Sequence, residues 1–219
     1  MTGNSKVTNS YSEGDVFGTK SYVGGLAGFG DVSKSYAKGF VRSDSSYVGG
    51  VTGVGRIDSS YHMGGNVSGA GYVGGLAGKS SKITNSYSEG DVRGTKTYVG
   101  GLVGYVSSDN IQKSYSKGTV KSDSSYVGGV VEYIYGRIDS SYHIGGNVIG
   151  AGYVGGLVGY ASSSVEDSYS EGDVIGTNYV GGLVGSGGVS KSFVKGAVRS
   201  NSSYVGGLQV QAILILLTI

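Results

Sequence analysis

The chain has no cysteine, no proline and no tryptophan. It also lacks any hydrophobic run of the ~20 residues that a membrane helix needs. The lack of cysteine excludes disulfide support and leaves the redox compartment open. The lack of proline suits strands with hydrogen-bonded neighbours on both sides, because proline cannot donate to a ladder. The net charge is +2 with both signs interspersed, so no nucleic-acid surface is expected.

Glycine is abundant, at 45 of 219 residues, but it has no G-X-Y period, which excludes collagen. Its placement follows a tetrapeptide, Tyr-Val-Gly-Gly, that occurs eight times. The copies begin at Tyr22, Tyr47, Tyr72, Tyr98, Tyr126, Tyr153, Tyr179 and Tyr204. A spacing of 25 to 28 residues is typical of a stacked repeat protein.

Each repeat carries four aliphatic positions, which can form a continuous core when the repeats stack. The first column is Val7, Val32, Ile57, Ile83, Ile111, Ile138, Val165 and Val189. The second is Val16, Val41, Val67, Val92, Val120, Val148, Val174 and Val198. The third is the valine of each Tyr-Val-Gly-Gly. The fourth is Leu26, Val51, Leu76, Leu102, Val130, Leu157, Leu183 and Leu208.

The apolar runs are short, lack a helical period and are punctuated by glycine, which indicates strands. Val23 and Leu26 are three residues apart, so a straight strand would point them to opposite faces. We expect Gly24-Gly25 to form a corner or bulge that turns both side chains inward. The predicted fold is an all-β, right-handed parallel β-helix of about eight coils. At ~4.8 Å per coil, it would be a rod ~38 Å long.

Two segments follow from this pattern: a β-solenoid over residues 1–208 and a non-repeat tail over 209–219. The tail, QVQAILILLTI, can be read as a cap for the last coil or as a truncated or frameshifted end. The N-terminus has no apolar signal-peptide core. These features leave open whether the chain is a fragment of a longer protein.

Tyrosine forms two further columns, for which a stacked structural ladder is the simplest interpretation. One is Tyr11, Tyr36, Tyr61, Tyr87, Tyr115, Tyr142 and Tyr169, with Phe193 last; the other is the first residue of each Tyr-Val-Gly-Gly. Four tyrosines lie outside these ladders, in the stretch where coil length varies: Tyr105, Tyr133, Tyr135 and Tyr160. In solenoids, variation on one face often marks the binding face. We expect these rings either to stack on a flat ligand such as a sugar or to form an ordinary ladder.

Charged residues alternate between coils in a way that can set the register. Stacking is expected to place Glu13 over Lys38, Glu89 over Lys117 and Glu171 over Lys195. An exposed ion pair is worth only ~0–1 kcal/mol, so its role would be to penalise slippage between near-identical coils.

Motifs for catalysis or metal binding are lacking. The pair Glu13 and Asp15 could act as acid and base in glycoside cleavage, but it recurs in the repeat, which favours a repeated surface. His62 and His143 occupy equivalent positions in separate triplets of coils, and no zinc or calcium motif is present. We therefore expect no cofactor, no metal and no enzymatic activity.

The segments YVGGLAG and YVGGLVG resemble GLUG-motif repeats over nearly the whole chain to Leu208. Coils two and five depart from the pattern, with GGVTG and GGVVE. The resemblance implies an extracellular or cell-surface location and a role in an adhesin-like array, because such repeats occur in large secreted or surface proteins of bacteria and archaea.

The sequence thus favours a non-catalytic structural or adhesive segment. Its expected partners are a surface glycan or a cell-surface or host protein, and end-to-end self-association is a further possibility. Two alternatives remain: a carbohydrate-active β-helix that binds or cleaves polysaccharide, and the non-catalytic repeat region of a larger surface protease.

Overall fold

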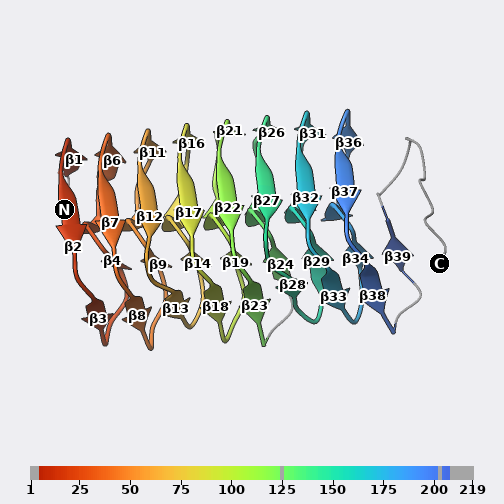
Figure 1. The fold of residues 1–219 in the computed structure, drawn as a ribbon, viewed down its shortest axis with the longest axis horizontal. Helices are drawn as coiled ribbons and strands as arrows, with labels where there is room; N and C mark the ends of the chain where they lie inside the picture. Colours follow the sequence, from red (N-terminus) through yellow and green to blue (C-terminus); the bar gives the residue numbers. More distant parts are fainter. Residues whose placement is uncertain (1–4, 124–125, 202–203, 208–219) are drawn as a thin grey trace.

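The computed structural model describes residues 5–123, 126–201 and 204–207. This part of the chain consists of parallel strands of two to four residues, without a helix. The chain winds through one coil after another, and the coils lie side by side along a rod (Figure 1). The first and last described coils are at its opposite ends (Figure 1). The predicted all-β solenoid of about eight coils is confirmed.

Strands at the same place in successive coils pair in parallel and form five sheets, named A to E in chain order. Sheet A contains β1 (Lys6–Thr8), β6 (Asp31–Ser33), β11 (Ile57–Asp58), β16 (Ile83–Thr84), β21 (Ile111–Gln112), β26 (Ile138–Asp139), β31 (Val165–Glu166) and β36 (Val189–Ser190). Sheet B contains β2 (Tyr11–Glu13), β7 (Tyr36–Lys38), β12 (Tyr61–Met63), β17 (Tyr87–Glu89), β22 (Tyr115–Lys117), β27 (Tyr142–Ile144), β32 (Tyr169–Glu171) and β37 (Phe193–Lys195). Sheet C contains β3 (Val16–Gly18), β8 (Val41–Ser43), β13 (Val67–Gly69), β18 (Val92–Gly94), β23 (Val120–Ser122), β28 (Val148–Ile149), β33 (Val174–Gly176) and β38 (Val198–Ser200).

The remaining two sheets follow the Tyr-Val-Gly-Gly segments. Sheet D contains β4 (Val23–Gly24), β9 (Val48–Gly49), β14 (Val73–Gly74), β19 (Val99–Gly100), β24 (Tyr126–Gly128), β29 (Tyr153–Gly155), β34 (Val180–Gly181) and β39 (Val205–Gly206). Sheet E contains β5 (Ala27–Phe29), β10 (Thr52–Val54), β15 (Ala77–Ser80), β20 (Val103–Val106), β25 (Val131–Ile134), β30 (Val158–Ala161) and β35 (Val184–Ser186).

The aliphatic columns fill two cores that run along the rod. The columns of sheets C and D pack against each other in one all-valine cluster, so the outer faces of these two sheets point away from each other. The first and fourth columns form the other cluster, together with inward residues of sheet E. Val48 and Val51, the coil-two equivalents of Val23 and Leu26, are both fully buried, one in each cluster. Leu208 and the tail 209–219 lie outside the described residues.

In the first four coils, a tyrosine with positive φ forms the corner between sheets C and D, and the two glycines that follow it leave space for neighbouring groups. Tyr22 and Tyr98 have φ values of 67° and 65°, in the left-handed region. A Cβ on Gly24 would lie 2.5 Å from the Thr52 Cα of the next coil. A Cβ on Gly50 would lie 2.7 Å from His62 Nδ1. Glycine is therefore required for close approach of backbones and side chains rather than for a special φ.

A serine ladder crosses the corner between sheets A and B. From Ser35 onward, the Oγ of each serine before the sheet-B aromatic accepts the backbone N–H of the equivalent serine in the preceding coil. The hydroxyl of each serine in this ladder donates to the carbonyl two residues earlier in its own coil. The ladder consists of Ser10, Ser35, Ser60, Ser86, Ser114, Ser141, Ser168 and Ser192. It satisfies backbone donors that strand pairing leaves over at this corner.

Replacing Ser114 with alanine is expected to lower the free energy of unfolding by ~1–3 kcal/mol, because the buried N–H of Ser86 loses its acceptor at 3.1 Å. Chemical denaturation followed by circular dichroism measures this. Ser108→Ala is the control, since that residue is exposed in a bend between strands. Equal stability of the two variants would show that the ladder contributes nothing.

Candidate functional site

Three of the four predicted face tyrosines form one stack on the outer side of sheet E. Tyr105, Tyr133 and Tyr160 are paired in register on β20, β25 and β30. The ring centroids are 5.6 Å apart for Tyr105 and Tyr133, and 5.0 Å apart for Tyr133 and Tyr160. Each ring is partly exposed, although the residues on both sides of it in the strand are buried. The structure thus brings together side chains that are 27 or 28 residues apart.

Tyr135, the fourth, lies across this stack. It is 52% exposed, with its ring 5.1 Å from that of Tyr133 and tilted by 60°. It meets the ring of Tyr105 edge-on, at 6.3 Å and 83°. Hydrogen bonding with Tyr133 raises the pKa of Tyr135 to about 12, so its hydroxyl is protonated at neutral pH.

The stack also contacts the Tyr-Val-Gly-Gly ladder beside it. Tyr98 and Tyr105 meet edge to face at 5.4 Å, and Tyr153 and Tyr160 at 6.1 Å. We call this surface the tyrosine face: Tyr98, Tyr105, Tyr133, Tyr135, Tyr153 and Tyr160.

The same column of sheet E extends in both directions from the stack. Toward the N-terminus it continues through Lys79 and Val54 to Phe29; toward the C-terminus it reaches Ser186. Lys79 Nζ lies 5.5 Å from the ring centroid of Tyr105. These neighbours were not predicted from the sequence, although all of them follow Tyr-Val-Gly-Gly at one fixed distance.

Stacking limits what this face can bind. Rings stacked along the rod cover each other's faces and leave their edges and hydroxyls to solvent, so three successive rings do not offer three platforms for sugar. Lys79 covers the outer face of Tyr105. Tyr160 is followed by the small Ser186, which leaves the ring face toward coil seven the least obstructed. The ring of Tyr160 is therefore the place on this face where a flat ligand can stack most readily.

The six residues predicted to form register pairs lie on adjacent strands of sheet B. Glu13 is paired with Lys38, Glu89 with Lys117 and Glu171 with Lys195 on adjacent strands of sheet B. Among the described residues, only the first pair forms an ion pair, at 2.8 Å. The Lys38 ammonium holds the pKa of Glu13 below its usual value. Glu89 instead accepts a hydrogen bond from the Tyr115 hydroxyl at 3.2 Å.

The aspartates of the candidate acid–base pairs are used to join coils. Asp15 Oδ1 accepts the backbone N–H of Phe40 at 2.8 Å, and Asp91 Oδ1 accepts that of Thr119 at 2.8 Å. Asp173 does the same for Ala197 at 2.9 Å. This arrangement gives these carboxylates a structural role between coils.

Comparison with protein families gives a match at residues 69–93, 96–121 and 150–175, each to the GLUG motif. Each matched stretch covers one turn of the solenoid, from Tyr-Val-Gly-Gly in sheet D to the valine of sheet C. This chain contains GLUG repeats. No curated protein and no solved structure gives a significant match to it. The part of the chain that the structure describes contains no helix able to span a membrane.

Glu132 is a buried acidic residue at a position where the neighbouring coils have glycine. It occupies the place of the final glycine of Gly-Leu-x-Gly, which is Gly104 in the coil before and Gly159 in the coil after. Its side chain is completely buried, and neither carboxylate oxygen has a hydrogen-bond partner. Burial raises its pKa to about 9.

The two histidines, His62 and His143, are buried on the inner side of sheet B. His62 Nε2 lies 2.9 Å from the carbonyl of Gly39, and His143 Nδ1 lies 3.0 Å from Ser116 Oγ. Burial lowers the pKa of His143 to about 4, so this ring is neutral at pH 7. Within the described ranges, no cluster of three or more histidines and acidic residues is arranged to hold a metal ion.

Proposed function

We propose that this chain is a non-catalytic structural and adhesive segment of a secreted or cell-surface protein. The rod of GLUG repeats would project or space other parts of that protein and bind a surface glycan through the tyrosine face. The surface location is inferred from the GLUG resemblance, which is specific because Tyr-Val and Gly-Leu-x-Gly recur together. A cell-surface or host protein is the other partner that such a segment could hold.

The observation that supports glycan binding is the ring of Tyr160 beside the small Ser186. A sugar ring has an apolar face of C–H groups that can pack on an aromatic ring, while its hydroxyls can hydrogen-bond to phenol groups. The edge of Tyr153, at 6.1 Å, borders this place, and the hydroxyl of Tyr133 lies 3.3 Å from Ser162 Oγ nearby. An aromatic body with a polar tip suits such a ligand.

Tyr160→Ala is expected to weaken glycan retention at least ~10-fold, since aromatic stacking on a flat ring contributes ~1–3 kcal/mol in the comparable case of nucleic-acid bases. Tyr105→Ala should weaken it less, because Lys79 covers the outer face of that ring. Retention on a glycan array measures both effects, with circular dichroism to check folding.

Tyr11→Ala is the matched control, because Tyr11 is the exposed end of the ladder on sheet B and is 67% exposed. An equal loss in this control would contradict a site at Tyr160. A wild-type chain that retains no glycan would overturn the adhesive role itself.

The carboxylates support the non-catalytic part of the proposal. A general acid or base must be free to exchange a proton with substrate, whereas Asp15, Asp91 and Asp173 accept backbone N–H groups of the next coil. A reducing-sugar assay on polyuronate tests this. Release of reducing ends that Glu89→Gln abolishes would favour the carbohydrate-active alternative.

End-to-end association remains part of the proposal. Strands of the inner coils, such as β6 and β11, pair on both sides along the rod, but among the described residues β1 to β5 of the first coil have a neighbour on one side only. Such edges can pair with another chain. Sedimentation at increasing concentration tests for oligomers, and a strictly monomeric species would exclude this association.

A further inference from the structure

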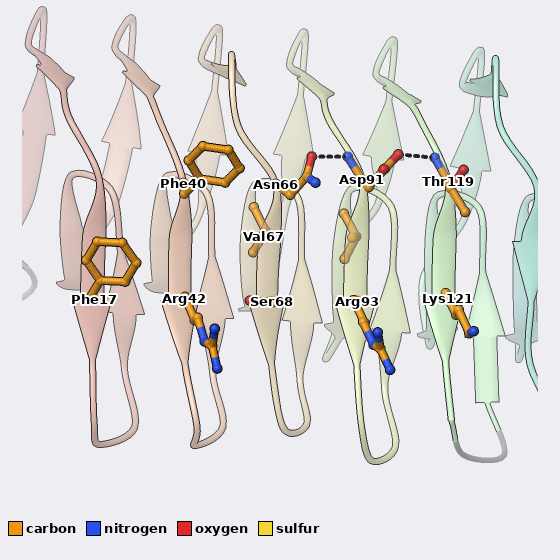
Figure 2. A pocket seen from close by; sticks show the side chains of 11 residues that line it. Phe17, Phe40, Arg42, Asn66, Val67, Ser68, Asp91, Arg93, Thr119 and Lys121 are labelled. Atoms are coloured by element: carbon orange, nitrogen blue, oxygen red, sulfur yellow. Dashed lines mark hydrogen bonds between the residues drawn. The ribbon is translucent and has the colours of Figure 1, made fainter.

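The outer face of sheet C contains a hollow of about 440 Å³ (Figure 2). It forms because one outward column changes from long to short side chains and back: Arg42, Ser68 and Arg93 occupy the same register position on β8, β13 and β18. Lys121 follows in the next coil. The small Ser68 therefore leaves a gap between two arginines, and Figure 2 shows Arg42, Arg93 and Lys121 extending in a row.

The charges of the lining favour an anion. Arg42, Arg93 and Lys121 are the cations, and Asp91 is the one acidic residue among the lining residues. Asp91 Oδ1 is already used by the N–H of Thr119, at 2.8 Å. Asn66 Oδ1 accepts the N–H of Asp91 at 3.1 Å, which leaves the amide NH₂ of Asn66 as a possible donor to a ligand.

Both arginines also contact exposed carboxylates outside the hollow. Arg42 lies 3.8 Å from Asp44, whose side chain is 82% exposed, and Arg93 lies 3.2 Å from Asp123, which is 45% exposed. Exposed pairs of this kind are weak, so a ligand carboxylate can replace them. The planar guanidinium groups suit bidentate binding of such a carboxylate.

The hollow also has an aromatic side. Phe17 and Phe40 line it and are 72% and 49% exposed, which is unusual for phenylalanine. Val67 and Val92 also line it, at the floor, although their side chains are buried in the valine core. A ligand that fits carries a negative group for the arginines and an apolar ring face for Phe40, and it extends along the rod toward Lys121.

We propose that this hollow binds an acidic polysaccharide, with the carboxylate of one uronic-acid residue between Arg42 and Arg93 over Ser68. The volume is within the range of small-ligand sites. The spacing of the cations, two coils and then one coil apart, suits a linear polyanion that runs parallel to the axis. The site is separate from the tyrosine face, because it lies on sheet C and shares no lining residue with the tyrosine stack, which lies on sheet E.

The test uses the whole chain and oligogalacturonate, with binding measured by titration calorimetry at low salt. The double variant Arg42→Gln/Arg93→Gln is expected to weaken binding at least ~10-fold, and wild-type affinity is expected to fall as salt is added. Phe40→Ser should weaken binding several-fold, because the sugar ring loses its apolar contact. Circular dichroism confirms that each variant folds.

The matched control is Arg137→Gln/Arg199→Gln, which removes the same net charge elsewhere on the rod. Arg199 lies in the same column as Arg42 but in the last coil, where it pairs with Asp173 at 2.8 Å. Arg137 pairs with Glu166 at 2.6 Å. This control should bind like the wild type.

Four outcomes would overturn the proposal. The first is a wild-type chain that does not bind oligogalacturonate at low salt. The second is an equal loss in the control double variant, which would mean attraction to net charge alone. The third is binding of dextran sulfate without binding of the uronate, which would reject a carboxylate site. Loss of uronate binding in Tyr160→Ala would also contradict it, since the two sites would then not be separate.

Discussion

Gly101→Val is expected to destabilise the central coils by at least ~3 kcal/mol, the upper end for overpacking a core. Gly101 is the second glycine of the fourth Tyr-Val-Gly-Gly. A Cβ on it would collide with the carbonyl oxygen of Gly129 in the next coil and lie 2.9 Å from Ser116 Oγ. That carbonyl also accepts the Ser116 hydroxyl at 2.6 Å, so neither group can move away without losing a buried hydrogen bond.

Thermal and chemical denaturation followed by circular dichroism measure this effect. Gly188→Val is the matched control, because a Cβ there would have no atom within 4 Å. That variant should unfold like the wild type. If both valine variants are equally stable, close packing against the second glycine does not maintain the stack.

The second large effect is a gain: Glu132→Gly is expected to raise the free energy of unfolding at pH 7 by roughly 3 kcal/mol. The folded-state pKa of about 9 lies well above the ordinary value of 4.5. At pH 7 the unfolded chain releases this proton and the folded chain retains it, which favours unfolding by ~1.4 kcal/mol per pH unit above 4.5. Glycine removes this penalty and restores the residue found in the neighbouring coils.

The effect has a definite pH dependence. A raised folded pKa means that the penalty from Glu132 is absent below about pH 4.5 and grows until about pH 9. His143 acts in the opposite sense: its pKa is lowered from 6.5 to about 4, so stability is lost as pH falls between these values. The wild type should therefore become steadily less stable above pH 6.5, and Glu132→Gly should not.

Glu132→Gln separates ionisation from size. It retains the buried side chain but cannot release a proton, so it should remove the alkaline loss of stability without adding the full gain of glycine. Denaturation curves from pH 5 to pH 9 measure all three proteins. A wild-type curve that does not depend on pH above 6.5 would show that Glu132 is not buried as described.

The core of the fold could be predicted because the same residue types return at the same place in each coil. Val48 and Val51 belong to columns that are visible in the sequence, and both are buried. Sheet E was less visible, since its inward position holds Ala77, Thr52 or Val103 in different coils. Small side chains of mixed polarity do not form a recognisable aliphatic column.

The candidate site was predictable in position but less so in geometry. The offset from Tyr-Val-Gly-Gly placed Tyr105 and Tyr160 on one face. That the rings would cover one another depends on side-chain rotation, which spacing does not determine. The hollow on sheet C depends on Ser68 lying between Arg42 and Arg93. This alignment indicates a hollow only when it is known that these three side chains point outward from the sheet. The burial of Glu132 likewise depends on how closely sheets D and E approach.

The coil-to-coil arrangement has a mechanical consequence. The first and last described coils lie at opposite ends of the rod, so tension applied along it would load the hydrogen bonds between coils in series (Figure 1). The coil at one end can then peel away while the others remain stacked. A released coil of 25 to 28 residues can extend to roughly 85–100 Å, compared with the ~4.8 Å it occupies in the rod. Under load, each released coil would lengthen about twenty-fold. The chain would therefore extend in steps and absorb mechanical work at each step.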